Sequence, residues 1–275
     1  MKGREAVMRH RVLALLLVSF VLGQGSSYAQ SPSPERLFEL GMNALSGVGS
    51  DRDEQGALGY LRHSADLGYP PAEVLLGYFY DTGTIITRDP GQAAFWYKKA
   101  AQQDDPVGGW LLGRLILSSA VPRDLNEANR WLQKSAAHGD PFGEYLLGRV
   151  KLEREDYPAA ANWFRKAAMQ GLPQAEQQLG QLLKQGQGVN LDKSEAYTWL
   201  LMSYDAGNQS VAVATALAQL QAELGSTQLD QAKSKAQELE QTANRVVTAR
   251  GCTGWTGELD VMPAPPPPDI QNFCR

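Results

Sequence analysis

Residues 186–199 read GQGVNLDKSEAYTW, and this stretch contains the spacing that decides the fold. Asp192 lies seven residues before Trp199, and Ala196 lies four residues after the aspartate. The same spacing from an aspartate to an alanine and then to an aromatic residue recurs upstream, with Tyr60 in place of tryptophan in the first copy. The five aspartates are Asp53, Asp89, Asp124, Asp156 and Asp192. Such recurrence identifies an internal repeat of about 35 residues.

A second pattern recurs with about the same period as the first. A Leu-Gly pair recurs, and in each copy a proline lies seven residues before the glycine. The glycines are Gly41, Gly77, Gly113, Gly148 and Gly180. Proline suits the first turn of a helix, and aspartate suits the position that caps one. Glycine costs about 1 kcal/mol inside a helix, so its recurrence indicates close packing. The two patterns predict an all-α protein, an α-solenoid of about five helix–turn–helix repeats over residues 30–207.

These residues resemble the Sel-1-like repeat, a relative of the tetratricopeptide repeat. The stretch 186–199 and the run Lys98-Lys99-Ala100-Ala101 carry the resemblance, which covers about residues 34–207. Two copies depart from the pattern: residues 152–156 lack most of the loop between the helices, and residues 118–120 replace its glycines. The resemblance implies an exported bacterial protein that binds a protein or peptide partner.

The C-terminal part of the chain loses the pattern. Residues 208–248 are predicted to form a capping pair of helices, with Thr227-x-x-Asp230 as a capping box for the last one. Residues 249–275 form a proline-rich tail that includes Pro265–Pro268, which is either a polyproline ligand or an extended linker. The two cysteines of the chain, Cys252 and Cys274, form one disulfide in an oxidising compartment or remain as two thiols.

The N-terminus has the order of a secretory signal. Basic residues precede an apolar run at 12–22, and Ser27-Tyr28-Ala29 offers small residues for cleavage. We therefore expect residues 1–29 to be a signal peptide and the mature chain to reside in the periplasm. A membrane anchor is the alternative, but the run is shorter than the roughly 20 residues of a spanning helix, so no stable membrane insertion is expected. The formal charge of −4 argues against a nucleic-acid partner.

One stripe of the first helices is the candidate partner-binding groove. In each copy it combines the positions four and eight residues after the proline, which share a helix face. The stripe consists of Val74, Tyr78, Trp110, Arg114, Tyr145, Arg149, Gln177 and Gln181. Aromatic residues and arginine carry much of the energy of interfaces. Arg114 and Arg149 are expected to face solvent, whereas Trp110 either lines the groove or packs between units.

The sequence contains no recognisable catalytic motif. His63 and His138 occupy different repeat positions and lack metal-ligand spacing, so no catalytic residue, metal or cofactor is expected. We interpret the chain as a periplasmic scaffold for an envelope protein or peptide. One alternative is binding or weak hydrolysis of β-lactams, as in disulfide-rich relatives, but those carry a cysteine pair in each repeat. The other alternative is a peptidoglycan or glycan binder that uses the Trp and Tyr residues.

Overall fold

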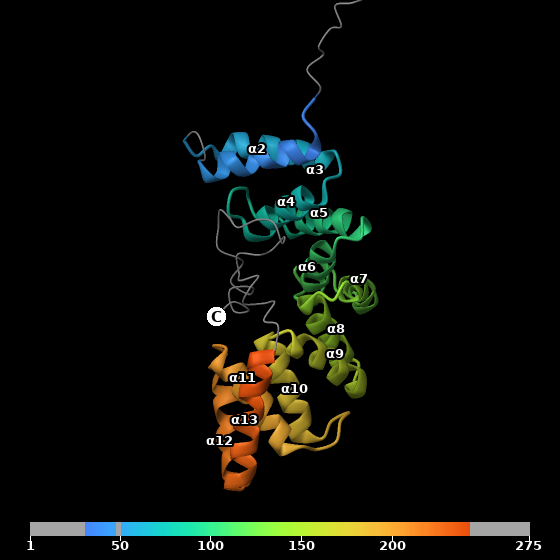
Figure 1. Cartoon of the computed structure of the whole chain (residues 1–275). Helices are drawn as coiled ribbons and strands as arrows, with labels where there is room; N and C mark the ends of the chain where they lie inside the picture. Colours follow the sequence, from blue (N-terminus) through green and yellow to red (C-terminus); the bar gives the residue numbers. More distant parts are fainter. Residues whose placement is uncertain (1–30, 48–50, 243–275) are drawn as a thin grey trace, which may run out of the picture. The chain divides into compact units, whose positions relative to one another are not determined.

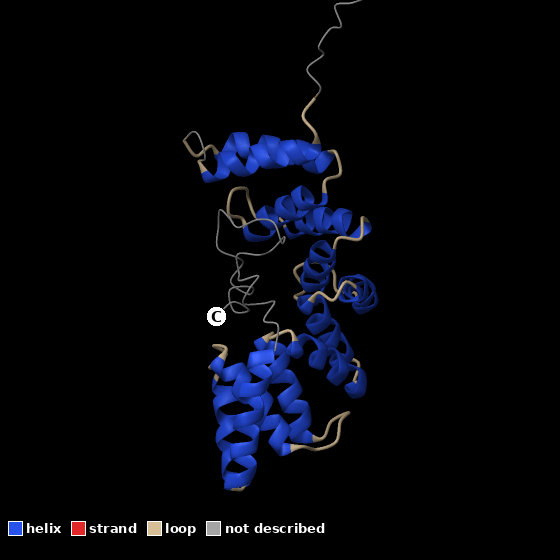
Figure 2. Cartoon of the chain, viewed as in Figure 1, coloured by secondary structure: helices blue, strands red, loops and turns tan. Residues whose placement is uncertain are grey.

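The structure, a computed structural model, describes residues 31–47 and 51–242. The expected signal peptide, the whole proline-rich tail and both cysteines lie outside the described residues. Every regular element of the described part is an α-helix (Figures 1 and 2). The helices are α2 (Pro34–Ser46), α3 (Glu54–Asp66), α4 (Pro70–Thr82), α5 (Pro90–Gln102), α6 (Pro106–Leu117), α7 (Leu125–Ala137), α8 (Pro141–Glu153), α9 (Tyr157–Met169), α10 (Pro173–Gln185), α11 (Lys193–Asp205), α12 (Val211–Glu223) and α13 (Ser226–Thr242).

The helices pair into five helix–turn–helix units. We number the units 1 to 5 from α2–α3 to α10–α11, and call the two helices of each unit its A helix and its B helix. Each helix from α2 to α11 packs against the next in the chain, and the A helices α4, α6 and α8 also contact one another in that order. In Figure 1 the B helices α5, α7 and α9 lie along one side of these A helices. The predicted all-α solenoid of about five repeats is confirmed.

Aspartate side chains begin the B helices, as the spacing predicted. In α5, the Asp89 carboxylate accepts hydrogen bonds from the backbone N–H groups of Gly91 and Gln92, at 2.9 and 3.0 Å. The equivalent aspartates of the other four units cap their helices in the same way. Asp105 and Asp140 cap the A helices α6 and α8, which the sequence analysis did not anticipate. Capping satisfies N–H groups that a helix leaves open and is worth about 1 kcal/mol each.

The recurrent Leu-Gly glycine lies where the two helices of one unit meet. A β-carbon built on Gly148 of α8 would lie 2.7 Å from the Phe164 ring of α9, closer than real contacts allow. The same position meets a large side chain of the B helix in every unit. These side chains are Leu61, Tyr97, Leu132, Phe164 and Leu200. Glycine therefore lets each pair of helices pack around one bulky residue.

The loop that connects α10 to α11 in unit 5 packs where unit 4 has only a short turn. Unit 4 passes from α8 to α9 through only three residues, whereas unit 5 has a seven-residue connection. Within that connection Gly188 has a φ of +70°, and a β-carbon there would lie 2.3 Å from the carbonyl carbon of Tyr157. The backbone of the unit 5 loop thus packs directly on the first residues of α9. A glycine is needed there for both its conformation and its size.

The end of the solenoid is built around α11. Both α12 and α13 pack on α11, and Ala232 and Ala236 of α13 are buried. The predicted capping box at Thr227 is wrong, because α13 already begins at Ser226. The Gly225 N–H donates instead to the Gln228 side chain, at 3.2 Å. Glutamine three residues into a helix can make this return bond as well as an acid can.

Candidate partner-binding surface

The predicted groove residues fall into a buried group and an accessible group. They lie on the A helices α4, α6, α8 and α10, as expected. Five of them are buried, and three are exposed or partly exposed. The buried residues are Val74, Tyr78, Trp110, Arg114 and Tyr145, and the accessible ones are Arg149, Gln177 and Gln181. The stripe is therefore not one uniform contact surface.

Arg114 corrects one expectation. It is only 8% exposed, and its guanidinium pairs with the buried Asp81 carboxylate. The Tyr97 hydroxyl lies 3.5 Å from the same carboxylate, so the cluster joins α4, α5 and α6. Burial and the Asp81 charge raise the pKa of Tyr97 well above 10.0, which keeps its hydroxyl protonated as a donor. Arg114 thus stabilises the junction of units 2 and 3 and does not face solvent.

Trp110 packs between units, one of the two roles considered for it. Its ring stacks on Phe142 at the start of α8, with the ring centroids 4.9 Å apart. Tyr145 of the same helix lies 5.8 Å from Phe164, again centroid to centroid. Stacked or tilted aromatic pairs add about 0.5–1.5 kcal/mol beyond the area they bury. The Trp110–Phe142 pair thus joins units 3 and 4, whereas the Tyr145–Phe164 pair lies within unit 4.

The accessible part of the stripe lies on α8 and α10. Arg149 is exposed, and Gln177 and Gln181 are partly exposed. The Gln177 carbonyl accepts a hydrogen bond from Asn208 at 2.8 Å, which fixes the orientation of its amide. Burial raises the pKa of the Tyr145 hydroxyl, and the neighbouring Arg149 partly opposes this rise. One cationic and two amide side chains thus offer polar contacts on the A helices of consecutive units.

Buried glutamates are a feature that the sequence analysis missed. Glu73, Glu144 and Glu176 are buried, each three residues after the proline of its A helix. Glu73 contacts Lys99 at 3.3 Å and accepts a hydrogen bond from Gln103 at 2.8 Å, and Glu144 accepts one from Gln170 at 2.8 Å. Burial raises the pKa of Glu73 and of Glu144, although the neighbouring lysines partly oppose it. Their recurrence after the proline was a visible signal.

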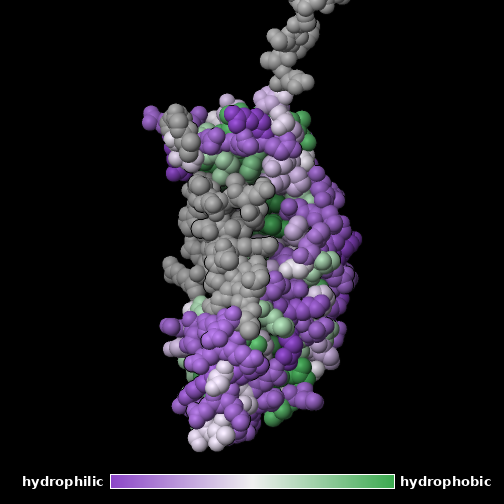
Figure 3. All heavy atoms as spheres, in the orientation of Figure 1, coloured by the Kyte–Doolittle hydropathy of each residue, from purple (hydrophilic) through white to green (hydrophobic). Residues whose placement is uncertain are grey.

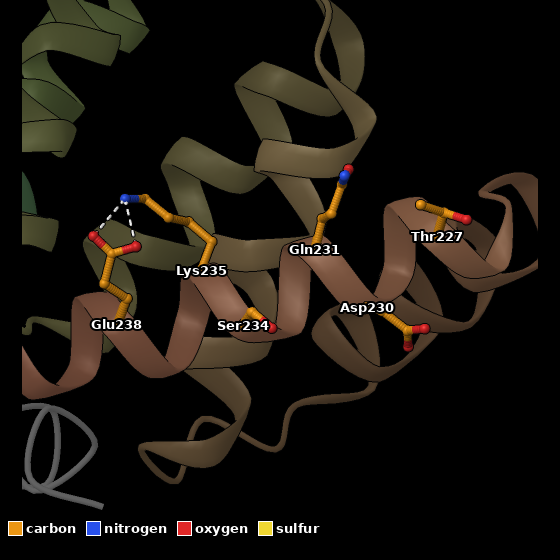
Figure 4. A pocket seen from close by; sticks show the side chains of 6 residues that line it. All are labelled: Thr227, Asp230, Gln231, Ser234, Lys235 and Glu238. Carbon is orange, nitrogen blue, oxygen red and sulfur yellow. Dashed lines mark hydrogen bonds and ion pairs between the residues drawn. The ribbon is translucent and has the colours of Figure 1, made fainter.

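An open hollow lies along α13. Figure 4 shows its lining side chains, which are Thr227, Asp230, Gln231, Ser234, Lys235 and Glu238. All come from one helix, and Lys235 pairs with Glu238 at 3.0 Å. Within residues 31–47 and 51–242, no group of three His, Cys, Asp or Glu side chains is placed to hold a metal ion. No helix of the described part is long and apolar enough to cross a bilayer.

The repeated pairs of helices and their capped ends define a helical repeat protein. The Sel1 repeat model matches residues 37–69, 70–105, 110–140, 143–172 and 173–208. The chain therefore belongs to the Sel1 repeat family, as its motifs indicated. Proteins of this family generally act as scaffolds for protein–protein interactions and not as enzymes.

Two solved structures share the fold. Protein c5321, described as a protective antigen present in uropathogenic Escherichia coli strains, is 28% identical with a TM-score of 0.72. That match covers 81% of this chain and 48% of that chain. A Sel1 repeat protein from Oxalobacter formigenes is 23% identical with a TM-score of 0.59, over 80% of this chain and 92% of that chain.

One curated relative matches by sequence over a short segment. An uncharacterized protein of Neisseria meningitidis serogroup B is 34% identical over 73 residues, which is 26% of this chain and 15% of the relative. The chain thus matches only a small part of that relative's length, and about half of the E. coli antigen.

Proposed function

We propose that this protein is a periplasmic scaffold that holds a protein partner of the cell envelope on the A helices of units 4 and 5. The contact residues are Arg149, Gln177 and Gln181. The proposal rests on a contrast between two kinds of residue. The aspartates, glycines and buried side chains that recur in every unit cap or pack the helices, whereas these three accessible side chains serve no capping or core role.

The chemistry of this surface suits a polypeptide. Amide side chains both donate and accept hydrogen bonds, which matches the N–H and C=O groups of an extended chain. Arg149 adds a cation that can bind a carboxylate through two N–H groups. Arg149 and Gln177 lie on the A helices of consecutive units, α8 and α10, so an extended partner segment that runs along the solenoid can meet both. The periplasmic location follows from the predicted signal peptide at residues 1–29.

Site-specific crosslinking in cells tests the proposal. A photo-crosslinking residue replaces Gln181 in the full-length chain, and crosslinked partners are separated from a cell-envelope fraction. We expect a discrete adduct whose yield falls several-fold when Arg149→Glu is added, because interface charge reversal costs affinity. Fractionation of the same cells locates the protein.

The matched control is Arg130→Glu, which makes the same change of charge on the exposed surface of the B helix α7. It should leave the adduct at position 181 unchanged. An adduct insensitive to Arg149→Glu, or a protein found only in the cytoplasm, would contradict the proposal in its site or its location respectively.

A glycan-binding role receives less support. Sugar binding by stacking requires accessible aromatic faces, but Trp96, Trp131 and Trp199 are all buried, and the exposed rings of Tyr60 and Phe95 lie on the B helices of different units. These indoles pack within the units, and two of them donate hydrogen bonds to glutamates of their own helices. The accessible polar side chains therefore favour a scaffold that binds a polypeptide over a glycan-binding role.

A further inference from the structure

The B helices of units 2, 3 and 4 are basic in an acidic chain. The formal charge of the whole protein is −4. In contrast, α5, α7 and α9 together carry six basic side chains and one acidic side chain. The basic residues are Lys98, Lys99, Arg130, Lys134, Arg165 and Lys166, and the acidic one is Glu127. We call these residues, together with Phe95, the basic B-helix face.

Side-chain bridges show that the three helices adjoin. Lys98 of α5 pairs with Glu127 of α7 at 2.9 Å. The Gln170 amide, which follows α9, donates a hydrogen bond to the carbonyl of Gly139, which follows α7, at 3.0 Å. Figure 1 places α5, α7 and α9 along the same side, and Figure 3 shows that this side is largely hydrophilic. The basic residues therefore belong to one surface that crosses three units.

The cations of this face are held in place by rings. Lys99 lies 4.5 Å from the centre of the Trp96 ring, Lys134 lies 5.5 Å from Trp131, and Lys166 lies 4.0 Å from Trp163. A lysine that rests on an aromatic ring has less conformational freedom to lose when it binds a partner. The face is thus partly ordered before binding.

Acidic neighbours neutralise only part of the charge. Glu127 serves two cations, Lys98 and, at 3.7 Å, Arg130, whose side chain is 64% exposed. Lys99 pairs with the buried Glu73, Lys134 lies 3.7 Å from Asp104, and Arg165 pairs with Glu195 at 2.5 Å. Together with Glu127, these acidic side chains pair with five of the six cations. Beside these charges Phe95 is 53% exposed, and Lys99 lies 5.9 Å from the centre of its ring. An accessible apolar ring among cations suits a ligand that combines carboxylates with apolar side chains.

We propose that the basic B-helix face is a second docking site, which binds an acidic, extended segment of a protein. This site is separate from the one on α8 and α10 and does not depend on it. Neighbouring helices pack about 8–10 Å apart, so three B helices present roughly 30 Å of surface. An extended chain advances about 3.3 Å per residue, and a segment of about ten residues spans the face.

Binding of a defined probe to the full-length protein tests the proposal. The probe is a fluorescein-labelled peptide of about ten residues in which Glu and Leu alternate, sized to the span of the face. Fluorescence anisotropy measures its affinity. Combining Arg130→Glu, Lys134→Glu and Lys166→Glu should weaken binding about tenfold or more, and added salt should weaken binding to the wild type. Phe95→Ala should weaken this probe more than a probe made of glutamate alone.

Arg149→Glu and Lys235→Glu are the matched controls, because they reverse exposed charges outside the face. Both should bind the probe with the affinity of the wild type. The experiment therefore tests this site independently of the proposed site on α8 and α10. The same three positions changed to Gln guard against misfolding, with circular dichroism as the check, and should weaken binding by an intermediate factor.

Three results would overturn the proposal. The first is equal affinity of the wild type and the triple Glu variant for the probe. The second is an equal loss of affinity in the two controls. The third is binding to dextran sulfate or to phosphatidylglycerol vesicles without binding to the peptide, which would assign the face to a polysaccharide or to a membrane.

Discussion

Gly148 and Phe164 occupy one contact in which the absence of a side chain on α8 makes room for a ring on α9. A β-carbon on Gly148 would lie 2.7 Å from Cδ1 of that ring. The two residues are not neighbours in the sequence, yet each explains the other. The same relationship holds in all five units, so the two helices of each unit approach each other at a glycine.

The first prediction concerns this contact. Gly148→Leu should lower the free energy of unfolding by about 1–3 kcal/mol or more, because overpacking forces the ring or the backbone to move. Urea unfolding at constant pH measures the change. Gly59→Ala is the matched control, since nothing lies within 4 Å of a β-carbon at that helical position. The control should gain up to about 1 kcal/mol from helix propensity. An equal change in the free energy of unfolding for the two variants would show that a side chain at position 148 does not collide with Phe164.

The second prediction concerns the unit 5 loop. Gly188→Ala should destabilise the protein through both a left-handed backbone and a collision with Tyr157. Gly139→Ala isolates the first effect, because Gly139 has a φ of +72° and no atom within 4 Å of a β-carbon. The backbone term alone costs roughly 1–2 kcal/mol. Thermal unfolding should show a larger loss for Gly188→Ala, and a loss no larger than that of Gly139→Ala would disprove the packing of the loop on α9.

The third prediction concerns the buried ion pair. Arg114→Ala should cost about 3–5 kcal/mol of stability, because it removes the cation that faces the buried Asp81 carboxylate. Arg149→Ala, on the exposed end of the same stripe, should change stability by less than about 0.5 kcal/mol. Replacing Arg114 and Asp81 together by Leu should cost less than Arg114→Ala alone. Denaturant unfolding of these three variants gives the comparison, and an Arg114→Ala protein as stable as Arg149→Ala would refute it.

The fourth prediction is a dependence on pH with opposite signs at two glutamates. Burial raises the pKa of Glu73 above 4.5, so the folded protein holds this proton more tightly than the unfolded chain does. The associated stability is fully present below pH 4.5 and is lost as the pH rises through the folded pKa. Glu73→Gln removes that loss, so its stability relative to the wild type should improve as the pH rises.

Glu127 provides the opposite case. The Lys98 hydrogen bond lowers its pKa, so its stabilisation is present above pH 4.5 and is lost as the pH falls through the folded pKa. Glu127→Gln should therefore become less stable relative to the wild type as the pH rises. Unfolding free energies of both variants between about pH 3 and pH 8 test the signs. Parallel slopes would show that the burial of Glu73 does not control its titration.

The repeated frame could be predicted because it depends on local rules. Asp89 caps the helix that follows it, and its partners lie two and three residues away. Such short-range relations are visible as spacing in the sequence. The existence and order of the helices in units 1 to 5 follow from them.

The groove residues could be placed on the right helices but not given the right exposure. Arg114 and Arg149 occupy the same repeat position, yet one is buried and the other is exposed. The difference is Asp81, which lies 33 residues before Arg114 and has no counterpart in the repeat pattern. Burial on the A helices depends on side chains one unit away, and those side chains vary from unit to unit. The basic B-helix face was missed for a related reason, since its helices are distant in sequence and adjoin only in the fold.

The packing of Gly188 on Tyr157 has a consequence for building new arrays from this protein. Solenoids are usually lengthened or shortened by adding or deleting single repeats, on the assumption that each repeat is interchangeable. Here the long loop of unit 5 packs on the helix that follows the short turn of unit 4, so we expect residues 141–207 to behave as a single folding unit. Arrays that duplicate or transplant this segment whole should fold, whereas a graft that divides it after residue 172 leaves the start of α9 uncovered.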